Sequence, residues 1–200
     1  MKIFDEIKLY LPKYLSADAL EDLFKNLKDF PNINERLYTG ILPDEDDLFQ
    51  GDGLRKMLVI NLPNPDVAEG PVMVLSNTCD TSFENPRLIC PAVIYCPIVK
   101  LSKYLHTLRS ASVSEAKLVA REDEIKRQRV SEIFFLPETG GLPEDCVALL
   151  SHVNSCDMDY LNPYAVKEKR LFSLSNTGLF FFVFKLGIHF TRIREQIDRK

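Results

Sequence analysis

Apolar residues recur at two different spacings along this chain, and each spacing predicts a different kind of element. Residues 16–30, SADALEDLFKNLKDF, place apolar side chains three and four residues apart, which is the repeat of an amphipathic helix. Ser16 can cap the start of this helix, and Pro31 ends it. We therefore predict an N-terminal helix. Its apolar positions are Leu20, Leu23, Phe24 and Leu27.

From residue 48 onward the apolar runs become short and rich in β-branched residues, and turn residues separate them. Closely spaced runs of this kind predict antiparallel strands in a small barrel or a strongly bent sheet. The predicted fold class is therefore α+β, with a barrel core at about 48–100 and 130–160. The strand-like runs are residues 57–63, 70–77, 87–99, 130–138 and 146–153.

Residues 101–129 interrupt the strand pattern, and their composition predicts an inserted, charged helical segment. Ser112 and Glu115 have the spacing of a capping box, which predicts where the helix begins. Two pairs of opposite charge lie four residues apart and support a helix in the same region. These pairs are Glu122 with Lys126, and Asp123 with Arg127.

A long helix is predicted at about 174–198, because apolar residues recur there at helical steps. The main stripe is Leu179, Phe182, Val183, Leu186, Phe190, Ile193 and Ile197. Further apolar residues fall off this stripe, so the helix has two apolar faces and needs a partner for each. We expect the barrel to cover one face and a second subunit to cover the other, which makes the protein a homodimer. The residues off the stripe are Phe180, Phe181, Phe184 and Ile188.

The composition is that of a folded protein, with 46% hydrophobic and 27% charged residues in a length that fits one domain. The first 15 residues carry charges throughout and do not have the pattern of a signal peptide. The richest apolar run, residues 178–190, contains a lysine and is shorter than the about 20 residues that a membrane span needs. Five cysteines without an export signal predict reduced thiols and a cytoplasmic protein.

The net charge of −4 is unevenly distributed along the chain. Residues 131–159 carry six acidic residues and no basic one, whereas residues 160–200 carry eight basic and three acidic residues. A generally acidic chain does not suit nonspecific binding of nucleic acid, which depends on many phosphate contacts. A local basic face could still contact RNA or an acidic protein.

The sequence Asn-(Thr/Ser)-Cys-Asp occurs twice, at residues 77–80 and 154–157. Asn, Asp and Ser side chains bond nearby backbone groups, so we predict that both copies end a strand in a turn. Loops at strand ends are also where scaffolds place functional residues. Asn77 and Asp157 are therefore candidate binding residues, and Asp80 is a candidate for a catalytic role.

A thiol or zinc site at Cys79 and Cys156 is the alternative interpretation of the same motif. A cysteine nucleophile needs a base and a lowered pKa, and His152 lies close to Cys156 in sequence. Cys79, His152 and Cys156 also offer the ligands that zinc prefers, although the ligand spacing of structural zinc sites is absent. No motif for nucleotide hydrolysis or standard hydrolase chemistry is present, and no cofactor is predicted.

Residues 50–98 combine several features in a fixed order. The motif QGD precedes the strand LVINLP, which is followed by an acidic turn, by GPVMVLSN and by RLICPAVIYCPI. In this order the stretch resembles the PemK/MazF family of toxin endoribonucleases. The resemblance implies an SH3-like barrel packed with helices, which is usually dimeric and which cleaves single-stranded RNA in many members. It further implies a toxin–antitoxin or phage-defence setting, with RNA, an antitoxin or another protein as partner.

One departure from the family affects the predicted site. The family usually has a basic residue beside the proline of the second strand, whereas this chain has Gly70 before Pro71. Arg87 is the cation of this core that could serve a phosphate, so Asp80 and Arg87 are the catalytic candidates for an endoribonuclease. Arg192, on the basic side of the last helix, is a further binding candidate. A non-catalytic module that binds another subunit through its acidic 131–159 region and its basic helix face is the alternative.

Overall fold

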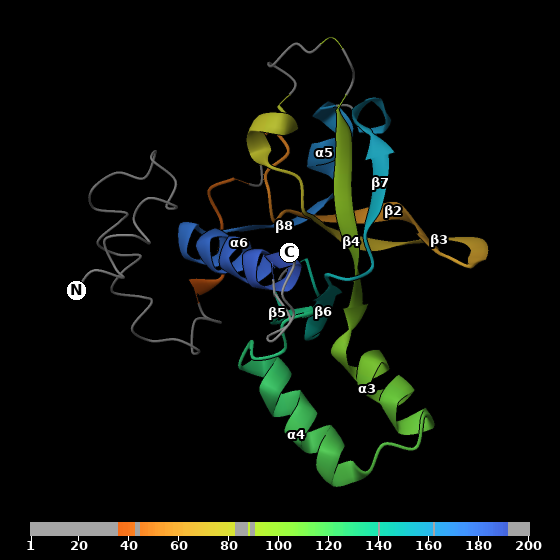
Figure 1. The fold of residues 1–200 in the computed structure, drawn as a ribbon. Coiled ribbons are helices and arrows are strands. Elements are labelled where there is room, and N and C mark those ends of the chain that lie inside the picture. The colour runs from red at the N-terminus through yellow and green to blue at the C-terminus, as the bar shows by residue number, and fades with distance from the viewer. Residues whose placement is uncertain are drawn as a thin grey trace, which may run out of the picture.

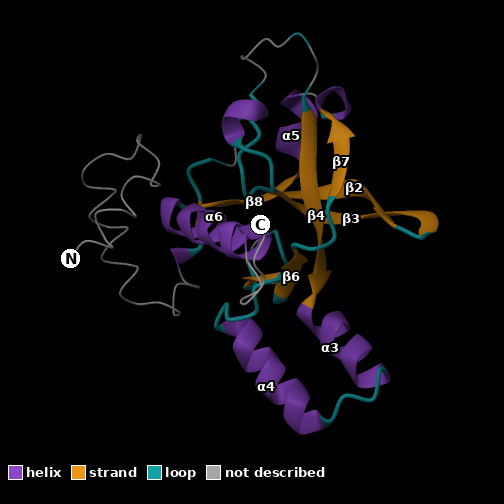
Figure 2. Cartoon of the chain, in the orientation of Figure 1, coloured by secondary structure: helices purple, strands orange, loops and turns teal. Residues whose placement is uncertain are grey.

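A computed structural model of the chain describes residues 36–42, 45–82, 88, 91–139, 141–161 and 163–191. These residues form a mixed α and β fold, in which one antiparallel sheet of eight strands is accompanied by four α-helices (Figures 1 and 2). The strands are β1 (Tyr38–Thr39), β2 (Gly53–Asn61), β3 (Asn64–Val74), β4 (Ala92–Lys100), β5 (Ile133–Leu136), β6 (Cys146–Leu149), β7 (Asn154–Asp157) and β8 (Arg170–Leu174). The helices are α3 (Leu101–Ser110), α4 (Glu115–Lys126), α5 (Pro163–Lys169) and α6 (Asn176–Thr191), with the short 3₁₀ helices η2 (Thr78–Asp80) and η3 (Met158–Tyr160).

The sheet follows the order β1-β8-β2-β3-β4-β6-β5, and β7 pairs with β4 beside this path. Consecutive strands β2, β3 and β4 lie side by side, as expected for a meander of closely spaced strands. The two ends of the path, β1 and β5, do not pair with each other among the described residues, so the sheet is not closed there. The predicted α+β class with an antiparallel sheet is confirmed.

A two-stranded ribbon projects from the sheet. β2 pairs with β8 only at Gly53 and Leu54, and β3 pairs with β4 only at residues 72–74. Beyond these residues, 57–61 and 64–70 pair only with each other, and they extend away from the other strands in Figure 1. We call residues 57–70 the ribbon. A bulge at its base, between Leu54 and Met57, gives Lys56 a positive φ of 56°.

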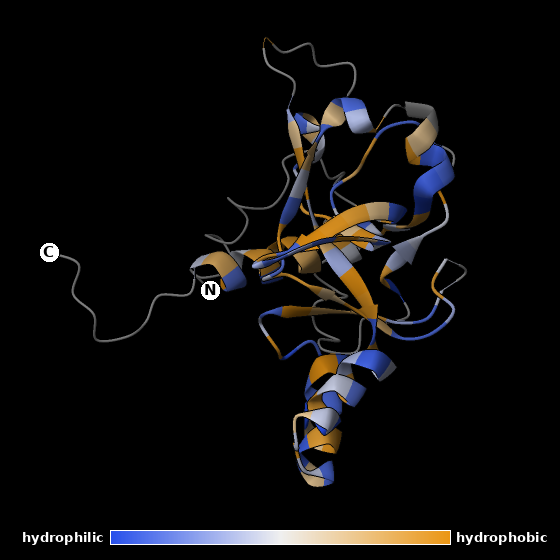
Figure 3. Cartoon of the chain, turned by 90° about the vertical axis from the view of Figure 1, so that its right-hand side faces the viewer, coloured by the Kyte–Doolittle hydropathy of each residue, from blue (hydrophilic) through white to orange (hydrophobic). Residues whose placement is uncertain are grey.

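Apolar side chains from the sheet pack in three clusters. The largest lies between the sheet and α6 and contains Phe134 and Phe182, whose rings meet edge to face at 5.1 Å. The second surrounds Met57, Tyr95 and Met158 on the side of α5. The third attaches α3 and α4 to β5 and β6. Figure 3 shows mainly hydrophobic residues in the central strands and a mixture of polar and apolar residues in α3 and α4.

The outer edge of β5 is occupied by a side chain. Gln128 is buried, has a φ of 57°, and directs its amide at the backbone of Phe135. Its Nε2 donates to the carbonyl oxygen of Phe135 at 2.8 Å, and the N–H of Phe135 donates to Oε1 of Gln128 at 3.0 Å. This side chain therefore substitutes for a neighbouring strand at Phe135.

The helical insertion predicted at 101–129 is confirmed, as two helices rather than one. Both predicted charge pairs of α4 are present at 2.9 Å, between Glu122 and Lys126 and between Asp123 and Arg127. The predicted capping box is wrong, because Ser114 occupies the N-cap position and Ser112 lies before it with a φ of 65°. The N-terminal helix predicted at 16–30 lies outside the described residues.

The C-terminal helix is present as α6, but the predicted buried stripe is partly wrong. Phe182 is buried as expected, whereas Val183 and Phe190 are 44% and 60% exposed. The close approach at Gly178 explains the rotation, because a Cβ there would lie 2.2 Å from the carbonyl oxygen of Leu37. Gly178 therefore faces the interior of the protein. The residues three, four and seven positions later lie on the same side of the helix and face the interior too. Those residues are Phe181, Phe182 and Lys185, and all are buried.

The segment 160–169 contains structure that its sequence pattern did not predict. None of the predicted strand runs or helices covers this segment, but it includes α5 and leads directly into β8. Arg170 begins β8 and is buried, so a charge stands where a strand pattern would have an apolar residue. No helix in the described part of the chain is long and apolar enough to cross a membrane.

Candidate functional site

The two copies of Asn-(Thr/Ser)-Cys-Asp have different structures. In the first copy Asn77 caps η2, because its Oδ1 accepts a hydrogen bond from the N–H of Cys79 at 2.8 Å. The predicted turn is confirmed there. The second copy is the strand β7 itself, so the prediction of a strand-ending turn is wrong for Asn154. The side chain of Asn154 accepts instead from the N–H of Ile60, on the ribbon, at 2.8 Å.

The fold nevertheless brings both copies to the same end of β4. The N–H of Ser76 donates to the carbonyl oxygen of Ile94 at one edge of β4, and Ser155 pairs with Ile94 at the other edge. β3 and β7 both run antiparallel to β4, so η2 and the end of β7 both lie at the start of β4 (Figure 1). Two strand spacings, about 10 Å, separate the backbones on the two sides of β4.

This strand-end region gathers only part of the predicted site. Cys79, Asp80 and Asp157 are exposed there, and Cys156 is half-buried. His152 lies at the opposite end of β7, where its N–H donates to the carbonyl oxygen of Leu149 in a turn. The structure therefore does not bring His152 to Asp157. Arg87 and Arg192 lie outside the described residues.

Three thiols, those of Cys96, Cys146 and Cys156, have raised pKa values and so lack the properties of activated nucleophiles. Burial raises the pKa of Cys156, and the neighbouring Asp157 raises it further, although Lys169 opposes them. Burial also raises the pKa of Cys96 to about 12 and that of Cys146 to about 11. A nucleophilic cysteine needs the opposite shift. Among the described residues, no three His, Cys, Asp or Glu side chains are grouped so that they could hold a metal ion.

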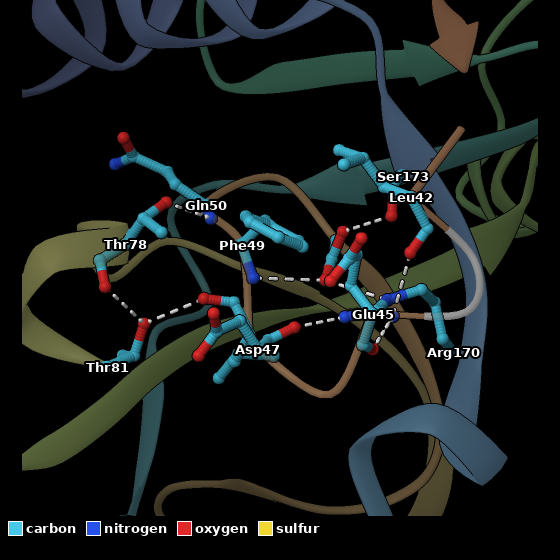
Figure 4. Close-up of polar contacts among 11 residues, drawn as sticks. Leu42, Glu45, Asp47, Phe49, Gln50, Thr78, Thr81, Arg170 and Ser173 are labelled. Carbon is cyan, nitrogen blue, oxygen red and sulfur yellow. Dashed lines mark hydrogen bonds and ion pairs between the residues drawn. The ribbon is translucent and has the colours of Figure 1, made fainter. Parts of the chain in front are cut away.

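The η2 turn is fastened to the loop that precedes β2. Thr81 is fully buried, and its hydroxyl donates to the carbonyl oxygen of Leu48 at 3.0 Å. Gln50 makes two further bonds, from its N–H to Oγ1 of Thr78 at 3.0 Å and from Nε2 to the carbonyl oxygen of Leu75 at 2.8 Å. Figure 4 shows the bond between Gln50 and Thr78 beside the bonds of Arg170. Hydrogen bonds therefore attach the loop at 45–52 to the η2 region on one side and to β8 on the other.

A buried ion pair anchors the other side of this loop. Nε of Arg170 donates to Oδ2 of Asp52 at 3.0 Å, and the two side chains are 2% and 0% exposed. Ser173 and the N–H of Phe49 also donate to this carboxylate, at 2.6 and 3.1 Å. Burial raises the pKa of Asp52, and the charge of Arg170 acts against that rise. This network explains the Gly-Asp of the QGD motif as a structural element, since Gly51 has a φ of 86° and lies against Leu174.

Arg170 has its donors committed to the loop. Its guanidinium donates to the carbonyl oxygens of Leu42 at 3.1 Å, of Glu45 at 2.6 Å and of Asp47 (Figure 4). A buried arginine with this many acceptors stabilises the loop backbone, and at 2% exposure its side chain is not accessible to a phosphate. Nothing in the sequence pattern indicated this role, because Asp52 and Arg170 are 118 residues apart.

A small basic cluster lies at the base of the ribbon. The bulge in β2 leaves Arg55 and Lys56 exposed, and Nζ of Lys169 donates to the carbonyl oxygen of Lys56 at 3.2 Å. The same Nζ lies 4.9 Å from the ring centroid of Tyr160, which is 44% exposed. We call Arg55, Lys56, Lys169 and Tyr160 the basic cluster. Sequence reasoning missed it because its members come from β2 and from the segment 160–169, for which no element was predicted.

The ribbon has one face that is apolar and exposed. Leu58 and Ile60 of β2 and Val67 of β3 point to the same side, with Ile60 directly opposite Val67. Their exposed fractions are 42%, 43% and 55%, and Leu62 at the tip is 78% exposed. A residue of β4 fixes the ribbon, because the hydroxyl of Tyr95 donates to the carbonyl oxygen of Leu58 at 2.7 Å. With the bond between Ile60 and Asn154, this contact fixes the apolar face in position.

Lys185 is a second buried cation, and the sequence pattern did not distinguish it from a surface lysine. It is 4% exposed, and its Nζ donates to Oε1 of Gln128 at 2.8 Å and lies 5.8 Å from the ring centroid of Phe134. Burial lowers its pKa to about 7. Unlike Arg170, it has an amide rather than a carboxylate as its acceptor.

No family model matches this chain, and a search of the curated proteins finds no match to it either. The function must therefore be inferred from the protein's own residues. The described structure offers two surfaces for this purpose, namely the apolar face of the ribbon and the basic cluster at its base.

Proposed function

We propose that this protein is a PemK/MazF-like, SH3-type barrel whose function is to bind another protein, and that the ribbon is its docking surface. The observation that carries the proposal is the exposed apolar face formed by Leu58, Ile60 and Val67. Exposed apolar patches on a folded protein mark sites of association more often than isolated apolar residues do. Because Tyr95 and Asn154 hold the ribbon, a partner would meet a surface that is already ordered.

The chemistry of the ribbon defines the kind of partner. Glu69 lies opposite Leu58 on the same face, so a carboxylate borders the apolar residues. A complementary partner would present apolar side chains with a lysine or arginine beside them. In a toxin–antitoxin or phage-defence setting, this partner would be the cognate protein that accompanies the barrel.

A binding role is favoured over RNA cleavage for two reasons. Gly70 stands where the family usually has a basic residue, and it lies opposite Met57 in the ribbon. The histidine nearest in sequence to the strand-end carboxylates, His152, is at the far end of β7. We therefore do not propose Asp80 and Asp157 as an acid and base.

The proposal is tested by purifying the full chain from its native cells with Ile60→Asp and Val67→Asp introduced together. Both side chains are already substantially exposed, so the protein is expected to fold and to lose a stoichiometric partner that the unmodified chain retains. The matched control is Val119→Asp on α4, a residue that is 67% exposed and far from the ribbon in sequence. Recovery of the same partner with the ribbon variant, or of no stoichiometric partner with the unmodified chain, would contradict the proposal.

RNA binding at the basic cluster is the second candidate function. It is supported by the stacking of Lys169 on the exposed ring of Tyr160, since cations with aromatic rings are the groups that bind single-stranded nucleic acid. Replacing Lys56 and Lys169 with alanine is expected to raise the Kd for a fluorescent single-stranded RNA about tenfold at low salt, because two phosphate contacts are lost. The control is Lys117→Ala on α4. An equal Kd for the variant, or no binding by the unmodified protein, would remove this candidate.

A further inference from the structure

The outer face of α6 is apolar and exposed, and it is separate from the ribbon. Phe184 and Phe190 are 55% and 60% exposed, and Val183 and Ile188 are 44% and 42% exposed. Phe184 and Ile188 are four residues apart, so they form one stripe along the helix. Figure 1 shows α6 and the ribbon on opposite sides of the sheet. This face therefore needs a cover other than the partner proposed for the ribbon.

The described chain begins beside the first turn of α6. The carbonyl oxygen of Arg36 accepts a bond from the hydroxyl of Ser175 at 2.5 Å, and that of Leu37 accepts from the N–H of Ser175 at 2.9 Å. Leu37 also lies against Gly178, so closely that a side chain at that glycine would collide with its carbonyl. Residues 1–35 consequently join the fold at the start of the helix whose outer face is exposed.

The lengths allow these residues to reach that face. Residues 31–35 can span at most about 17 Å between residue 30 and the start of α6. A helix over residues 16–30 would be about 22 Å long, close to the about 24 Å of the 16-residue α6. Its four apolar residues occupy one face over two turns, and the exposed stripe of α6 has a similar length.

We propose that residues 16–30 form an amphipathic helix that folds back and covers the outer face of α6. The apolar residues of this segment would pack against Phe184 and Ile188, and its charged residues would face water. A segment attached at Arg36 is present at a high effective concentration, so it competes favourably with a second copy of the chain for the same face. The occupant of this face is therefore intramolecular, in place of the second subunit that the sequence pattern predicts.

The test measures how fast a maleimide modifies a cysteine placed on α6. Phe184→Cys in the full chain is expected to react about tenfold more slowly than Val119→Cys on α4, because the segment protects it. Peptide mass spectrometry identifies each modified site, so the native thiols do not interfere. Breaking the apolar stripe with Leu23→Asp and Phe24→Asp is expected to remove the protection. Exchanging the charges on the opposite side of the segment, Asp22→Lys with Lys25→Asp, is expected to leave it intact.

Two results would overturn the proposal. The first is fast labelling of Phe184→Cys in the otherwise unmodified chain, since that face is then uncovered. The second is protection that disappears when the protein is diluted, which would identify a second copy of the chain as the cover. Cys96 is fully buried and reports whether the core stays folded during labelling. If the double aspartate variant exposes Cys96, the milder Leu23→Ser is used, and protection that survives it together with Leu27→Ser also counts against the proposal.

Discussion

Two buried cations in this protein have opposite surroundings. Arg170 is paired with the carboxylate of Asp52 and with several loop carbonyls, so its charge is compensated within the fold. Lys185 is as well buried, but its bonded acceptor is the neutral amide of Gln128, and burial lowers its pKa to about 7. We therefore expect the partner, as well as the depth of burial, to determine what happens to the stability of the fold when a buried cation is removed.

The largest effect is expected when the compensated pair is broken. Arg170→Ala leaves the carboxylate of Asp52 buried without its cation and releases the loop carbonyls, so we expect the free energy of unfolding to fall by about 3–5 kcal/mol. Urea denaturation measures this change. The control is Arg109→Ala, because Arg109 makes an ion pair with Glu115 that is exposed to water, and its loss is expected to leave the midpoint unchanged. Equal midpoints for both variants would contradict this account.

Removing the uncompensated cation is expected to have the opposite sign. Lys185→Met retains most of the side-chain volume and removes an amine that is costly to bury, so we expect stabilisation by about 2 kcal/mol at neutral pH. Gln128 keeps its two bonds to Phe135 in this variant. A clear loss of stability in the same urea experiment would mean that the bond from Lys185 to Gln128 outweighs the cost of burial.

The pH dependence of stability sharpens the same comparison. The pKa of Lys185 is about 7 in the folded protein and near the usual 10.5 when unfolded, so between these values the unfolded chain binds a proton that the folded chain does not. Stability is therefore expected to rise with pH across this window, with a slope of up to about 1.4 kcal/mol per pH unit. Below pH 7 the group is charged in both states, so its destabilising effect stays constant and it contributes no slope. Lys185→Met should remove the slope above pH 7. An unchanged slope between pH 7 and 9 would show that other groups cause it.

The smallest effect concerns one hydrogen bond within the compensated network. Ser173→Ala removes the donor at 2.6 Å from Oδ1 of Asp52 but leaves Arg170 in place. We expect a loss of about 1 kcal/mol, because the carboxylate keeps its other partners. Thermal unfolding of the variant, compared with Arg170→Ala, checks the order of the two effects. A loss as large as that of Arg170→Ala would mean that the network acts as one unit.

The sequence predicted the elements better than it predicted their contacts. The strand runs and the insertion at 101–129 were found because their periodicities are local properties of the chain. The buried face of α6 was partly wrong, because a close approach at Gly178 and an amide acceptor for Lys185 determine which side faces inward. Hydrophobicity counts a glycine and a lysine as poor core residues, so no periodic pattern could have identified that face.

The candidate site could be predicted only where its residues act locally. Asn77 caps the turn that follows it, and this role was visible in the motif. Asn154 carries the same motif but bonds to Ile60, which is 94 residues away, and the repeat alone could not distinguish these outcomes. The basic cluster and the pair of Asp52 with Arg170 also depend on contacts between distant segments. Such contacts follow from the strand order, which the local pattern does not contain.

The side chain of Gln128 at the edge of β5 has a consequence for the behaviour of this protein in concentrated solution. A terminal strand with open backbone groups is a template on which another molecule can assemble, and chains joined in this way precipitate or form fibrils. Here the N–H and carbonyl of Phe135 are already satisfied by an amide. By satisfying these groups, Gln128 hinders the addition of a strand from another molecule at this end of the sheet.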